Sequence, residues 1–135
     1  MVCSLEDIKD WAVSFVKYKD AVMKKYSSVS KSAFGVLAVL KKGGEEKYLC
    51  FVSLDDLDVA SLSDEKIICL NKKSNLDWLI TNWSSLIDKD SLFIFVNPSK
   101  SESWALHPKN HHIITDKAAL KSGLLSLFES VSEVK

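Results

Sequence analysis

Acidic and lysine side chains of this sequence occur close together in a few short segments. They are Asp56 and Asp58 in an acidic stretch, Asp64 and Lys66 in an Asp-x-Lys triplet, and the Glu-x-Lys triplet Glu45-Glu46-Lys47. In a convergent arrangement the carboxylates would hold a divalent cation while the lysine assists an attacking water, which is the chemistry of metal-dependent hydrolysis. The alternative is that these are solvated turn residues, because short acid-x-Lys triplets arise by chance in a chain rich in Asp, Glu and Lys.

All the histidines of the chain lie within six residues, at His107, His111 and His112, and Trp104 precedes them. Clustered imidazoles bind zinc or exchange protons near neutral pH, but no Cys, Asp or Glu lies inside this cluster. We therefore predict no metal site. We expect Trp104, His107, His111 and His112 to belong to a binding surface within residues 97–112, with Trp104 as its anchor and the imidazoles as partner contacts. Ordinary turn and hydrogen-bonding roles are the alternative.

The cysteines, Cys3, Cys50 and Cys69, are odd in number, widely spaced and without a C-x-x-C pair, which argues against a disulfide framework or a zinc ribbon. Cys50 and Cys69 interrupt apolar runs, so we predict that both are buried and reduced. Cys3, near the terminus, is expected to be the only thiol that reacts quickly with a bulky reagent. Because no phosphate-binding glycine loop, nucleophile elbow or His-Glu-x-x-His motif occurs, no cofactor is predicted.

The charge composition disfavours a nucleic-acid partner. The 135 residues carry 18 basic and 18 acidic side chains, and every basic one is lysine. Such a chain lacks both the cationic field that attracts phosphates and the planar guanidinium that reads guanine edges. No apolar run approaches the roughly 20 residues that span a bilayer, and the acidic N-terminal segment is unlike a secretory signal. We therefore predict a cytoplasmic location and a protein partner, without membrane association; the oligomeric state stays open.

The first half of the chain predicts a helix and a β-hairpin. Ser4 and Asp7 resemble a capping box, and apolar residues then recur at helical spacing over 5–26. The serine-rich segment 27–32 is predicted to be a loop, because its hydroxyls compete for backbone hydrogen bonds. Apolar runs at 34–40 and 48–54 flank a Gly-Gly pair and predict the hairpin. Since both runs are nearly continuous, helices are expected on both faces of these strands.

The second half predicts a βαβ unit. A strand at 66–70 precedes a helix that Ser74 and Asp77 would cap, and another strand follows at 91–96. Strands joined in this way are expected to be parallel. A short edge strand at 103–106 and a last helix capped by Asp116 complete the chain.

The fold class is therefore predicted as α/β (α+β), a single domain over residues 1–135. It has a mixed four- to five-stranded sheet and three helices in the order α-β-β-β-α-β-(β)-α. This order, with an acidic loop after the second strand, resembles the core of the PD-(D/E)xK nuclease-like fold, and the resemblance implies metal-binding or catalytic roles for Asp56, Asp58, Asp64 and Lys66. The prediction that we favour is a non-enzymatic binding or protein-interaction module. A metal-dependent nuclease-like enzyme is the alternative.

Overall fold

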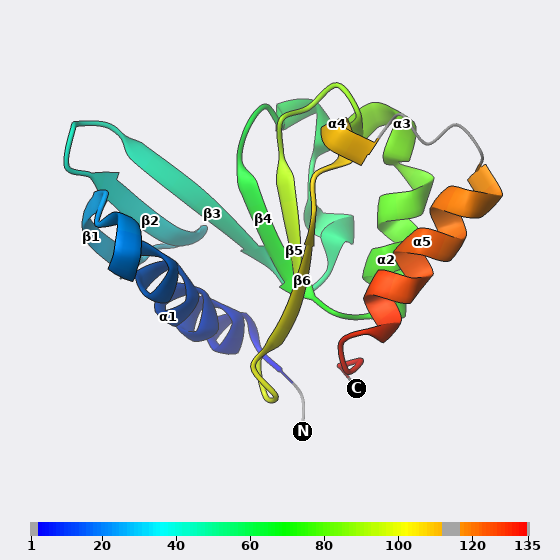
Figure 1. Ribbon diagram of the computed structural model, residues 1–135, viewed down its shortest axis with the longest axis horizontal. Helices are drawn as coiled ribbons and strands as arrows, with labels where there is room; N and C mark the ends of the chain where they lie inside the picture. The colour runs from blue at the N-terminus through cyan, green and yellow to red at the C-terminus, as the bar shows by residue number, and fades with distance from the viewer. Residues whose placement is uncertain (1–2, 112–116, 135) are drawn as a thin grey trace.

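The computed structural model describes residues 3–111 and 117–134 and contains a six-stranded sheet with helices on both faces (Figure 1). The helices are α1 (Leu5–Met23), α2 (Lys73–Thr81), α3 (Trp83–Leu86), α4 (Pro108–His111) and α5 (Lys117–Glu129). The strands are β1 (Tyr26–Lys31), β2 (Gly35–Leu40), β3 (Glu45–Phe51), β4 (Lys66–Leu70), β5 (Leu92–Asn97) and β6 (Glu102–Leu106), and two 3-10 turns, η1 (Leu54–Asp56) and η2 (Val59–Ser61), lie between β3 and β4. In the described part of the chain, no helix combines the length and apolarity that crossing a membrane requires.

The strands lie in the sheet in chain order, from β1 at one edge to β6 at the other. β1, β2 and β3 form an antiparallel meander, β3, β4 and β5 are mutually parallel, and β6 returns antiparallel to β5. The predicted hairpin, the parallel βαβ pair and the edge strand near 103–106 are therefore confirmed. The mixed α and β class is also confirmed.

Strand β1 is the largest departure from the predicted fold. The sequence predicts a loop at 27–32, but the chain from Tyr26 to Lys31 pairs with β2 along its length. Backbone pairing at a sheet edge leaves the serine hydroxyls exposed to water, so their loop-like composition is compatible with a strand. Over residues 3–111 and 117–134 the sheet thus has six strands, not four or five, and the chain forms five helices rather than three. Because four strands precede α2, the three-strand order that resembled the nuclease core is not observed.

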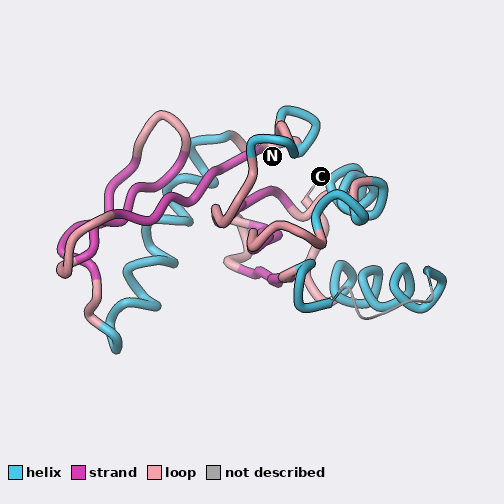
Figure 2. The backbone as a smooth tube through the Cα atoms, turned by 90° about the horizontal axis from the view of Figure 1, so that it is seen from above, coloured by secondary structure: helices cyan, strands magenta, loops and turns pink. Residues whose placement is uncertain are grey.

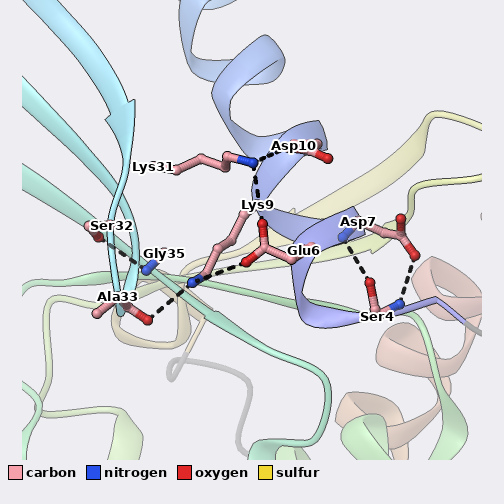
Figure 3. A network of polar contacts seen from close by, with 9 residues as sticks. All are labelled: Ser4, Glu6, Asp7, Lys9, Asp10, Lys31, Ser32, Ala33 and Gly35. Atoms are coloured by element: carbon pink, nitrogen blue, oxygen red, sulfur yellow. Dashed lines mark hydrogen bonds and ion pairs between the residues drawn. The ribbon is translucent and has the colours of Figure 1, made fainter.

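Helix α1 begins as predicted, at a capping box in which Asp7 N–H donates to the Ser4 hydroxyl and Ser4 N–H donates to the Asp7 carboxylate (Figure 3). It ends at Met23 rather than near residue 26, because Lys24 adopts the left-handed conformation (φ 50°) that terminates helices. The apolar periodicity predicted over 5–26 does not mark a buried side chain at Val22, which is 86% exposed.

Lysine side chains join α1 to the β1–β2 hairpin. Lys31 Nζ of β1 lies 2.8 Å from Asp10 Oδ1 and 3.2 Å from Glu6 Oε2, and the buried Lys9 donates to the carbonyl oxygen of Ala33 (Figure 3). These contacts fix the first half of α1 over the edge of the sheet.

Two apolar cores lie on opposite faces of the sheet. α1 packs its buried side, centred on Ala12, against one face, and α2, α3 and α5 cover the other face (Figure 2). The expectation that helices cover both faces of the predicted hairpin is wrong. In β2, Val36 and Ala38 are buried under α1, whereas Leu37 and Val39 on the other face are only partly buried. An antiparallel segment can expose one face to water in this way.

The helix between β4 and β5 differs from its prediction in two respects. The Ser74–Asp77 capping box does not form, because the N-cap is Lys72, two residues before Ser74, and the Asp77 carboxylate instead lies 2.8 Å from Lys73 Nζ. The helix is also interrupted at Asn82, where α2 ends and α3 starts. In α5, Leu124 and Phe128 are buried as expected, but Leu127 is 37% exposed. The predicted cap, Asp116, lies outside the described residues.

Candidate interaction surface between helix α1 and strand β6

Some of the acidic and lysine residues singled out in the sequence meet in one polar cleft. This cleft, about 360 Å³ in volume, lies at the amino ends of β3 and β4 and is lined by Glu45, Glu46, Lys47, Asp64, Glu65 and Lys66. Asp56 and Asp58 do not line it. They belong to η1 and to the cap of η2, both exposed, and Asp56 follows the carboxyl end of β3, which is the opposite end of the parallel pair.

The carboxylates of this cleft are engaged by neighbouring protein groups. Glu46 accepts a hydrogen bond from the Tyr26 hydroxyl and another from Lys66 Nζ at 3.0 Å. Partial burial raises the pKa of Glu46, but these bonds outweigh that effect and hold it below its ordinary value. In Glu65 the bonds from the Ser63 hydroxyl and backbone N–H likewise outweigh burial and lower its pKa. Among the residues that the structure describes, no three His, Cys, Asp or Glu side chains are grouped so as to hold a metal ion.

The tryptophan of the histidine segment is buried. Trp104 stacks on Phe95, with ring centroids 4.3 Å apart, and its indole N–H donates to Asn71 Oδ1 at 2.8 Å. His107 Nε2 lies 2.9 Å from Asp90 Oδ1. His111 is the last residue of α4, and His112 lies outside the described residues. The roles of Trp104 and the histidines in partner binding stay predictions.

The cysteines are all buried, so one expectation about them is corrected. Cys50 and Cys69 lie in the cores, as predicted. Cys3 is only 5% exposed rather than accessible, and its Sγ lies 3.5 Å from the hydroxyl oxygen of Ser99 in the β5–β6 turn. Packing of the N-terminal segment against that turn explains the difference.

An exposed aromatic stripe on α1 was not predicted from the sequence. Trp11, Phe15 and Tyr18 follow one another at spacings of four and three residues, which places them on one face of the helix. The rings of Trp11 and Phe15 stack with centroids 4.6 Å apart, both are only partly buried, and Tyr18 is 81% exposed. Ile8, Ala12 and Val16 already form the buried apolar face of α1. A second apolar stripe on the same helix is therefore the sequence signal that could have revealed the surface.

The aromatic stripe forms one wall of a groove against the edge of the sheet. A hollow of about 520 Å³ is lined by α1 residues and by Ser101 and Ser103, which lie in the β5–β6 turn and in β6. A second hollow of about 460 Å³ continues toward the turn at Pro98 and shares Trp11, Ser14 and Ser101 with the first. The groove thus runs between α1, the first helix of the chain, and β6, an edge strand of the sheet.

Strand β6 presents an open edge beside this groove. Its backbone pairs with β5 and, within the described part of the chain, makes no hydrogen bond to any other backbone segment. Trp104 and Leu106 point into the core, whereas Ser103 and Ala105 point the other way and are exposed. The small size of these two side chains leaves the groove open along the strand.

Charges of opposite sign flank the groove. The carboxylates of Asp7 and Asp10 lie at the end near the β5–β6 turn, and Lys19 lies at the other end. Such an arrangement distinguishes the two directions in which a charged chain can lie.

Comparison with known proteins gave no relative: no protein-family model, curated protein or solved structure matches this chain.

Proposed function

We propose that this protein is a non-enzymatic interaction module that binds an extended segment of a partner protein as an added strand on β6. The observation that carries the proposal is that an open strand edge lies beside an aromatic wall: β6 and the Trp11–Phe15–Tyr18 stripe line the same groove. An exposed edge is a template for another strand, and proteins use it to recognise extended peptides.

The backbone of β6 supplies the affinity in this proposal. β6 has five residues, so a bound segment of similar length would extend over about 17 Å at roughly 3.4 Å per residue. The N–H and C=O groups of the bound segment would form hydrogen bonds with the C=O and N–H groups of β6 that point away from β5. Because main-chain bonds carry little sequence information, the specificity has to come from side chains in the groove.

The groove determines the sequence pattern that a bound partner segment must have. Alternate side chains of an added strand point to the α1 side, where Ser103 and Ala105 leave space and Trp11, Phe15 and Tyr18 offer apolar surface. A matching segment therefore carries an apolar residue at every second position. Charge complementarity with the flanking groups adds a basic residue near the β5–β6 turn and an acidic residue near Lys19.

The experiment uses ten-residue peptides selected on the full-length protein from a random displayed library, followed by affinity measurement with the best synthetic peptide. Tyr18→Ser tests the groove, and Val22→Ser is a matched control, because both residues are highly exposed on α1 but only Tyr18 lines the hollow. We expect a dissociation constant on the order of 10 µM and a loss of roughly tenfold with Tyr18→Ser, since aromatic contacts dominate such interfaces.

A second variant fills the groove instead of emptying it. Ser103→Trp places a large ring where the exposed hydroxyl of β6 lines the hollow, and it is expected to abolish binding while leaving the core side of the strand intact. Selected peptides without alternating apolar residues, or with equal affinity for the wild type, Tyr18→Ser and Ser103→Trp, would contradict the proposal.

A further inference from the structure

An apolar cleft, separate from the polar cleft at β3 and β4, lies between the second half of α1 and the sheet, at the amino ends of β4 and β5. Its volume is about 270 Å³, and its apolar lining comes from Phe15 and Val16 of α1 and from Leu92 and Ile94 of β5. α1 crosses the sheet obliquely and diverges from β5 and β6 toward its C-terminus, so this part of the sheet face is only partly covered (Figure 1). The floor of the cleft is therefore apolar while its opening faces solvent.

Lysine ammonium groups surround the opening. Lys19, Lys25 and Lys66 all line the cleft, and each lies over an aromatic ring that also lines it. The distances from Nζ to the ring centroid are 4.8 Å for Lys19 on Phe15, 5.0 Å for Lys25 on Tyr26 and 5.1 Å for Lys66 on Tyr48. Contact with the rings holds the aliphatic stems in place and keeps the charges at the rim.

The carboxylates at this rim do not neutralise all three cations. Glu46 lies 3.0 Å from Lys66 Nζ and 3.8 Å from Lys25 Nζ, so one carboxylate serves two lysines. Asp20 accepts the backbone N–H groups of Lys25 and Tyr26 at the C-terminus of α1. Among the described residues, Lys19 forms no ion pair with a carboxylate, and the charge around the cleft is positive.

From this combination we infer that the cleft binds a small amphiphilic monoanion, an apolar body of limited size that carries a carboxylate. The apolar part would occupy the floor on Val16, Leu92 and Ile94, and the carboxylate would lie at the rim near Lys19. The volume sets the size: at roughly 30 Å³ of liquid volume per water molecule, 270 Å³ corresponds to about nine non-hydrogen atoms. A medium-chain fatty acid or a simple aromatic acid meets these requirements.

The test is a titration of the full chain with sodium octanoate, in which binding is monitored by calorimetry and by amide chemical shifts. Octanol keeps the chain and removes the charge, octyltrimethylammonium reverses the charge, and acetate removes the chain. Lys19→Met removes the ammonium but retains the length of the stem, and Lys17→Met is the matched control on the same helix outside the cleft. Lys25→Met provides a second variant at the rim.

We expect octanoate to bind and to shift amides around residues 16, 66 and 94, with octanol, octyltrimethylammonium and acetate each at least fivefold weaker. Lys19→Met should weaken octanoate by at least fivefold, and Lys17→Met should not change it. Equal binding of octanol, an unchanged affinity in both rim variants, or shifts confined to other surfaces would overturn the inference. The cleft and the peptide groove share Phe15 and Lys19. Because the titration contains no peptide and leaves Tyr18 and β6 unaltered, its failure would not bear on strand addition at β6.

Discussion

Asn71 should be the most sensitive single position for the stability of the β6 region. The residue follows β4 and is fully buried. Its side-chain amide donates to the carbonyl oxygens of Phe128, Val131 and Ser132 at 3.1–3.3 Å, and its carbonyl accepts the indole N–H of Trp104 at 2.8 Å. One side chain thus connects β4, β6 and the residues that follow α5.

The replacement Asn71→Leu keeps the approximate volume but removes every one of these bonds. It leaves the indole N–H of Trp104 and at least one carbonyl oxygen without their partners in the core. An unsatisfied buried group costs about 1–3 kcal/mol, so we expect the free energy of unfolding to fall by roughly 3–5 kcal/mol. Trp104→Phe should cost about 1–3 kcal/mol, through the lost bond and the smaller ring.

A double-mutant cycle measured by urea denaturation separates the shared bond from the other losses. Because the two single variants both remove the Asn71–Trp104 bond, the double variant should be less destabilised than their sum by about 1–2 kcal/mol. Asn75→Leu is the control partner, since Asn75 is equally buried but bonds to Leu54, Val52 and Leu70 instead. Additivity of Asn71→Leu and Trp104→Phe within about 0.5 kcal/mol would refute this view of the network.

Three further outcomes are expected. Gly35→Ala should cost more than about 3 kcal/mol in thermal or urea unfolding, because Gly35 has φ +152° and a Cβ there would lie 2.1 Å from the carbonyl oxygen of Tyr48. Gly123→Ala in α5, where a Cβ meets nothing within 4 Å, should instead stabilise the protein by about 0.5–1 kcal/mol. No cysteine should react quickly with a bulky thiol reagent in the native state, because all three are buried and burial raises the pKa of Cys50 to about 12; fast labelling of any one would show that its packing is wrong. Glu46→Gln should lower the free energy of unfolding by about 1 kcal/mol at pH 7. Because the pKa of Glu46 is depressed in the folded state, its contribution is fully present above the unfolded pKa and is lost as the pH falls through the lower folded-state pKa. The difference between variant and wild type should therefore shrink steadily in a denaturation series that continues below the unfolded pKa, and a difference that does not depend on pH would contradict this role.

Local sequence signals were sufficient for the elements whose stabilising contacts are close in the chain. The Ser4–Asp7 capping box and the hairpin around the Gly-Gly pair belong to this class. Each depends on side-chain periodicity or on turn residues within a few positions. These features follow from the sequence without knowledge of the tertiary structure.

The features that escaped prediction depend on pairings that residue types alone do not specify, whether the partners are near or far in the chain. The serine-rich β1 becomes a strand because β2 offers a backbone partner, which composition does not record. The Asp77 carboxylate pairs with Lys73 rather than capping α2, because α2 begins one residue before Ser74. The groove combines an α1 stripe with a strand about 90 residues away, and only the fold brings them together.

The most direct measurement for the peptide groove is amide hydrogen exchange of residues 102–106 with and without a selected peptide. We expect the amides of β6 that point away from β5 to exchange rapidly in the free protein, because within the described residues no backbone partner protects them. Strand addition predicts that alternate amides of β6 become protected on binding, while those already paired with β5 change little. Binding of the peptide with unchanged exchange along β6 would contradict strand addition.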